Sequence, residues 1–190
     1  ATVSETWYIL SDSLTLSSGN KVPYKTFNNS TVFNTKNARI DLMIGDDLSL
    51  WVVNLDTVVH QFEISNLTSP LSISVGDSVL VTETFNAAGI YLAKDPTVFQ
   101  RYDQIGLSTM ITVKDHSHNS FYWNIKEYNS SWFPDIIDGL SVDWSNYQPN
   151  FFTINGAEYP AINSDPEARI EGFVNDTIYI YIANTGQSIH

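Results

Sequence analysis

The chain has 190 residues, 43% of them hydrophobic and 16% charged, and its 9 Lys and Arg against 21 Asp and Glu give a formal net charge of −12. This composition suits a folded core, and the acidic balance repels phosphate groups, so we expect no nucleic-acid partner. Cysteine is absent, which excludes disulfides and thiolate chemistry within these residues. No apolar run is long enough to span a bilayer, so we expect no membrane span.

The first part of the chain shows strand signals separated by turn residues. Aromatic residues make up 13% of the chain, a composition typical of all-β proteins. Turns are predicted at Gly45-Asp46-Asp47 and Val75-Gly76-Asp77, where Gly supplies a positive φ and Asp bonds its own backbone. The predicted strands are residues 6–11, 22–27, 39–44, 48–54, 60–64, 78–84, 89–93 and 110–113. Eight short strands over about 115 residues fit a Greek-key β-sandwich.

A polar break, Lys-Asp-His-Ser-His-Asn at residues 114–119, separates this part from the next. Strands are then predicted at residues 120–128, 151–154, 169–173 and 177–183, with a helical turn at 134–139. Four strands make about half a sandwich. We therefore expect one complete domain over residues 1–115 and the N-terminal half of a second over residues 116–190.

An internal echo links the two parts. Each part reads Ala-Arg-Ile-acidic, turns at a Gly-Asp or Asn-Asp pair, runs into an alternating strand that ends in Asn, and reaches His six residues later. The first copy begins at Ala38 and passes Asn54 to His60, and the second begins at Ala168 and passes Asn184 to His190. Two related units are indicated.

The segment 151–160, FFTINGAEYP, resembles the segment that opens the last cupredoxin domain of laccase-like and nitrite-reductase-like multicopper oxidases. In that family Asn-x-Gly leads into a His-x-x-His-x-His copper motif, and Asn184-Thr185-Gly186 followed by His190 is similar to its approach and first His. The resemblance implies paired cupredoxin-like sandwiches and copper-based oxidation of small substrates, with electrons passed to oxygen or nitrite.

The copper ligands of the family are mostly missing from this chain. A type 1 site needs two His, a Cys thiolate and usually a Met. His60 has the position of the first-domain His, but the expected Cys segment reads Leu-Ala-Lys-Asp-Pro at residues 92–96, and the Gly-Met position reads Gly106-Leu107. The first domain is therefore expected to lack copper. His190 is the one metal ligand that the resemblance assigns, and neither catalytic nor cofactor-binding residues are assigned.

Other residues have structural alternatives. His60 is expected to be a structural strand residue whose ring meets a backbone group. His116 and His118 are expected in a solvent-exposed linker, with a weak metal site as the alternative. Trp123, Trp132 and Trp144, with nearby tyrosines, fit packing between the sandwiches or a carbohydrate-stacking platform.

Two functions remain open at this point. The first is part of a secreted multicopper-oxidase-like protein, a copper-dependent oxidoreductase when intact and inactive as these residues alone, with copper held mostly by sequence outside them. Its partners would be a small-molecule substrate, and either a second copy or the missing C-terminal strands. The alternative is a copper-free extracellular β-sandwich for binding or adhesion. The start at Ala1 without Met or a basic leader fits a mature secreted or periplasmic chain, and a shortened chain would begin in the same way.

Overall fold

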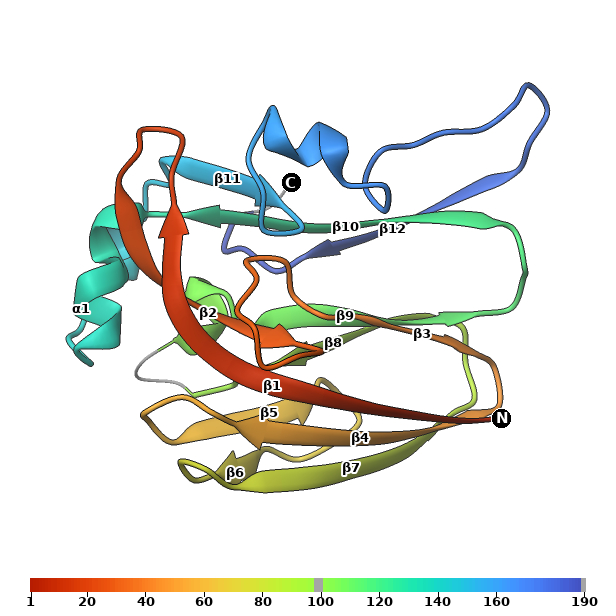
Figure 1. The fold of residues 1–190 in the computed structure, drawn as a ribbon, viewed down its shortest axis with the longest axis horizontal. Coiled ribbons are helices and arrows are strands. Elements are labelled where there is room, and N and C mark those ends of the chain that lie inside the picture. The colour runs from red at the N-terminus through yellow and green to blue at the C-terminus, as the bar shows by residue number, and fades with distance from the viewer. Residues whose placement is uncertain (98–100, 189–190) are drawn as a thin grey trace.

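A computed structural model describes residues 1–97 and 101–188. The N-terminal part opens with a four-stranded sheet of order β2-β1-β4-β7 (Figure 1). Strand β1 is antiparallel to β2 and parallel to β4, and β4 is antiparallel to β7. The strands are β1 Thr2–Thr15, β2 Lys21–Asn28, β4 Asp46–Asn54 and β7 Ser78–Phe85.

A five-stranded sheet of order β3-β9-β8-β5-β6 faces the first. It holds β3 Ile40–Met43, β9 Ser108–Lys114, β8 Gly89–Lys94, β5 His60–Ile64 and β6 Leu71–Ile73. Strand β3 is parallel to β9, and the other neighbours are antiparallel. The turn predicted before β4 is confirmed, since Gly45 has φ of 83° and the Asp46 carboxylate accepts from Met43 N at 2.9 Å.

Alternating side chains build the core between these two sheets. Leu48, Leu50 and Val52 on β4 are 1%, 0% and 0% exposed. The rings of Trp7 and Phe27 in the four-stranded sheet lie 6.3 and 5.6 Å from that of Phe62 in the five-stranded sheet. The all-β sandwich predicted from composition and period is thus confirmed.

A third sheet, of order β11-β10-β12, lies beside this sandwich (Figure 1). It holds β10 Asn119–Tyr128, β11 Phe151–Ile154 and β12 Ile178–Asn184. The short α-helix α1 Phe133–Ile137 overlaps the helical turn predicted at residues 134–139. Single 3-10 turns cover Tyr102–Ile105, Ser130–Trp132, Trp144–Asn146 and Ala161–Ser164. Among the described residues, no helix is long and apolar enough to cross a membrane.

The third sheet repeats three strands of the first. Strand β10 is antiparallel to β11 and parallel to β12, as β1 is to β2 and β4. The registers also correspond, because Trp7 pairs with Val52 and Trp123 pairs with Ile182. The echo in the sequence therefore has a structural counterpart.

The two faces of the third sheet have different surroundings. The face with Tyr122 and Asn124 packs on the sandwich, where Tyr122 Oη donates to Asp41 at 2.6 Å and Asn124 Nδ2 donates to the carbonyl of Ser108 at 3.0 Å. The opposite face carries Ile180 and Ile182, which are 43% and 49% exposed. One apolar face of this sheet is thus only partly covered by the described residues.

The strand predicted at residues 169–173 is wrong, because this segment forms no ladder. Its counterpart in the first unit is β3, whose ladder partner is β9. The described residues contain no counterpart of β9 beside the third sheet, so an alternating segment there has no strand to bond to. Strand β6, three residues long, was not predicted.

Candidate functional site

His60 is fully buried at the first position of β5 and lies between two carboxylates. Its Nδ1 lies 2.7 Å from Asp95 Oδ2, and its Nε2 lies 2.8 Å from Asp56 Oδ2. An ionised carboxylate only accepts hydrogen bonds, so this geometry favours an imidazolium whose two ring nitrogens both donate, and the raised pKa of His60 agrees with it. The expected backbone partner is wrong, because the partners come from segments that flank different strands.

Two turns and one strand position the groups around this ring. Asp56 follows β4, and its Oδ1 accepts from Thr57 N at 2.7 Å. Asp95 follows β8, and its Oδ1 accepts from Thr97 N at 2.9 Å. Lys25 on β2 reaches Asp56 through Nζ and is 4% exposed. Two cations and two carboxylates therefore form a charge-balanced buried set, which we call the His60 cluster.

The pKa values in the His60 cluster move in opposite directions. Burial lowers the pKa of His60, but the hydrogen bonds to Asp56 and Asp95 outweigh it, and the pKa stands above its ordinary value of 6.5. Burial raises the pKa of Asp56, but hydrogen bonds from His60 and Lys25 outweigh it and hold the pKa well below 3.8. Both shifts favour the ion-paired state.

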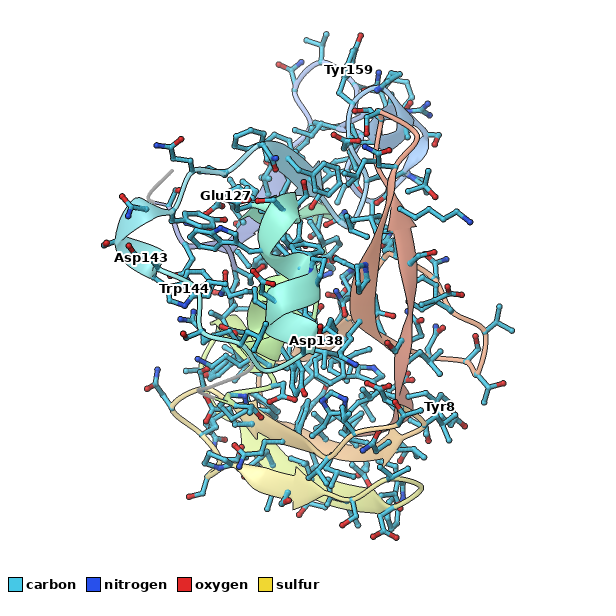
Figure 2. The ribbon with its side chains drawn as sticks, turned by 90° about the vertical axis from the view of Figure 1, so that its left-hand side faces the viewer. Tyr8, Glu127, Asp138, Asp143, Trp144 and Tyr159 are labelled. Carbon is cyan, nitrogen blue, oxygen red and sulfur yellow. The ribbon has the colours of Figure 1, made fainter. Side chains whose placement is uncertain are left out.

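A second arrangement surrounds the end of β12. The Asn184 side chain accepts from Gly186 N at 3.1 Å and donates to the carbonyl of Ser188 at 2.6 Å. Thr185 N donates to the carbonyl of Ile125 at 2.9 Å. The buried carboxylate of Glu127 on β10 accepts from Gln187 N and Ser188 N, both at 2.5 Å, and lies close to the upper end of α1 in Figure 2. Residues 184–188 thus form one fixed turn, and His190 lies outside the described residues.

Comparison with known proteins rests on structure. No protein-family model matches the chain, and no curated protein does. The Cu-containing nitrite reductase NirK from Thermus scotoductus SA-01 matches with a TM-score of 0.74 and 18% identity, over 98% of this chain and 44% of its own. Blue Copper Oxidase from Nitrosomonas europaea matches with a TM-score of 0.69 and 17% identity, over 98% of this chain and 62% of its own. Fet3p, a multicopper oxidase that functions in iron import, matches with a TM-score of 0.68 and 14% identity, over 98% of this chain and 37% of its own.

The chain has a cupredoxin-like fold. The resemblance drawn from segment 151–160 and the Asn-x-Gly approach is confirmed at the level of the fold, because the matching structures are multicopper oxidases and copper nitrite reductases. The chain spans 55% of the multicopper oxidase mgLAC and 44% of the nitrite reductase NirK.

The first cupredoxin-like sandwich does not fit a copper ion. Both nitrogens of His60 are occupied by carboxylates, and Asp95 lies in the segment where the resemblance expects Cys. Leu107, at the expected Met position, is fully buried. Among residues 1–97 and 101–188, no group of three or more His, Cys, Asp or Glu could hold a metal ion.

The two histidines between β9 and β10, His116 and His118, are not a free chelating pair. His116 Nε2 lies 2.9 Å from Tyr181 Oη, and its Nδ1 accepts from His118 N at 3.2 Å. The His116 ring also stacks on Tyr179, with 3.5 Å between ring centroids. These contacts hold residues 116–118 against β12.

The tryptophans do not form a single platform. Trp132, Trp144 and Tyr147 pack together near α1, with ring centroids 5.4 to 5.8 Å apart. Trp123 lies on the opposite face of the third sheet from Tyr122, and its Nε1 donates to the carbonyl of Ala168 at 2.9 Å. Packing accounts for these rings.

Sequence reasoning missed Lys126, a buried amine in the contact between the third sheet and the sandwich. It is 3% exposed, and Nζ donates to the carbonyl of Gly106 at 3.0 Å and to Ser108 Oγ at 2.5 Å. Burial lowers the pKa of Lys126 from 10.5 to about 7. Alternation along β10 places Lys126 on the face that packs on the sandwich, together with Asn124. That alternation is the one feature of the sequence from which the burial of Lys126 could have been predicted.

Lys126→Met should remove a pH dependence of stability. The folded state releases the Lys126 proton near pH 7 and the unfolded state near 10.5, so unfolding takes up a proton between these values and stability rises with pH. We expect the unfolding free energy to gain about 2–4 kcal/mol over this window in the parent and to lose that gain in the variant. Urea denaturation from pH 6 to 10 measures it, with exposed Lys21→Met as the control; equal slopes in parent and Lys126→Met would contradict it.

Proposed function

We propose that the chain is the N-terminal part of a secreted or periplasmic copper-dependent oxidoreductase of the multicopper-oxidase type. Residues 1–115 would be a copper-free structural domain, and residues 116–190 would be the first half of a domain that holds copper. His190 would be one ligand, and the other ligands would come from sequence outside these residues. The substrate would be a small molecule.

The observation that carries this proposal is the match to copper enzymes over nearly the whole chain. The second unit supports it, because the turn at residues 184–188, which precedes His190 in the sequence, is fixed by side chains from β10 and β12. Ligands on rigid elements hold a metal in one geometry.

The copper content of the complete protein tests this proposal. We expect copper that survives dialysis and an electron paramagnetic resonance signal of Cu(II), both lost or reduced in His190→Ala. His118→Ala, which removes an exposed imidazole, serves as the matched control and should leave the copper content unchanged. A complete protein that retains no copper would contradict the proposal.

A copper-free binding or adhesion module is the second candidate. The closed His60 cluster favours it, since one of the two corresponding histidines serves structure alone. Copper-free protein with unchanged folding when His190 is replaced would support this alternative.

A further inference from the structure

Lys25 and Asp56 meet in the interior of the first sandwich, although they lie 31 residues apart in the sequence. Lys25 lies on β2, and Asp56 lies in the turn after β4; both strands pair with β1. The two side chains are 5% and 3% exposed, and Lys25 Nζ contacts Asp56 Oδ2. A primary amine and a carboxyl group are therefore held against each other away from bulk water.

An ion pair is a costly state for two buried charges. The free energy needed to take an ammonium and a carboxylate out of water can exceed the gain from their attraction. Joining Lys25 and Asp56 as an amide would remove both charges at once. His60 and Asp95 would remain as a balanced pair, because Nδ1 of the ring lies 2.7 Å from Asp95 Oδ2.

The groups around the Asp56 carboxyl match what amide formation requires. Nε2 of His60 lies 2.8 Å from Oδ2, the same oxygen that Lys25 contacts. An imidazolium at this place can protonate that oxygen as it leaves. The other oxygen, Oδ1, accepts from Thr57 N at 2.7 Å, so a backbone N–H lies where negative charge would develop. Nucleophile, acid and oxyanion donor thus surround one carboxyl carbon.

We propose that Lys25 and Asp56 form an intramolecular isopeptide bond. One proton passes from the Lys25 ammonium to Oδ2, and the neutral amine attacks Cγ of Asp56 while the carbonyl electron pair moves to Oδ1. The Cγ–Oδ2 bond then breaks as His60 Nε2 gives its proton to Oδ2, which departs as water. The new amide nitrogen returns one proton to His60. An ammonium and a carboxylate thus become one amide and one water, and the ion-paired His60 cluster is the reactant.

The bond would fasten strand β2, which stands first in the order β2-β1-β4-β7. It would join β2 directly to the turn after β4, across the intervening strand β1. A covalent link that closes a loop restricts the unfolded chain and so stabilises the folded one. This role is independent of copper and of the proposed function.

The intact mass of the folded protein, measured after denaturation in acid, tests the proposal. We expect a mass about 18 Da below that of the sequence, the mass of one water. Lys25→Arg should have the full mass of its own sequence, because a guanidinium keeps the positive charge but stays protonated and does not attack. Lys36→Arg is the matched control and should keep the deficit, since Lys36 also pairs with a carboxylate, Asp165 at 2.8 Å, but is 33% exposed.

Tandem mass spectrometry of a tryptic digest locates the bond. We expect a branched peptide that joins Lys25 to Asp56 and is not cleaved after Lys25. A folded His60→Gln variant should stay at its full mass, because it lacks the acid that protonates the leaving oxygen. A parent protein at full mass, or a deficit that Lys25→Arg retains, would overturn the isopeptide bond. A deficit of unchanged extent in His60→Gln would overturn the role of His60.

Discussion

His60→Ala should lower the free energy of unfolding by about 3–5 kcal/mol, because it leaves two buried carboxylates without the cation between them. Asp56 and Asp95 are 5% and 0% exposed, so bulk solvent does not solvate their carboxylates. Urea denaturation followed by tryptophan fluorescence measures the loss, since Trp7 lies in the same core. His118→Ala, which removes an exposed imidazole, is the matched control and should change stability by less than about 0.5 kcal/mol. Equal effects of the two variants would contradict the ion-paired assignment.

The His60 cluster also sets a pH range for this stabilisation. The raised pKa of His60 means that its contribution is present below pH 6.5 and is lost as pH rises through the folded-state value. The lowered pKa of Asp56 means that its contribution is present above pH 3.8 and is lost as pH falls through the folded-state value. Both contributions are complete between these two values. Above pH 7 the contribution of Lys126 to the free energy of unfolding rises with pH, whereas that of His60 falls. His60→Ala and Lys126→Met should therefore change the pH dependence of the unfolding free energy at alkaline pH in opposite directions.

The sequence predicted the strands well where polar and apolar residues alternate and a partner strand is present. Residues 48–54 show this pattern, and they form β4 with its apolar side chains in the core. Residues 169–173 have a similar pattern and form no strand. Hydrogen bonding to a neighbour decides strand formation, and period alone does not reveal whether the neighbour exists.

The buried charges could not be predicted from the sequence. Asp95 is 35 residues from His60, and Glu127 is 60 residues from Gln187. No local spacing marks such pairs, because the sheet topology brings them together. The echo did predict that His60 and His190 correspond in position. It could not show that the two carboxylates beside the His60 ring come from Asp56 and Asp95.

A chain that ends at His190 should self-associate through the third sheet. Ile180 and Ile182 correspond to Leu50 and Val52, which are fully buried, yet they are 43% and 49% exposed. Covering each of them stabilises by about 1 kcal/mol, roughly half the value for a whole isoleucine side chain. Strand β12 also ends the order β11-β10-β12, whereas its counterpart β4 pairs onward with β7. An apolar face beside an open strand edge is a template for pairing with another chain.

Sedimentation velocity and hydrogen exchange test this expectation together. The chain should sediment as a dimer or larger species at micromolar concentration. Where it is diluted to monomer, the amides of β12 should exchange faster than those of β4, because one edge of β12 has no strand beside it among the described residues. Ile180→Lys with Ile182→Lys should shift the species toward monomer, since buried charges oppose sheet-to-sheet contact. Phe173→Lys is the matched control, because Phe173 is 88% exposed outside any strand. A monomeric chain with β12 amides as protected as those of β4 would show that the third sheet is complete without further strands.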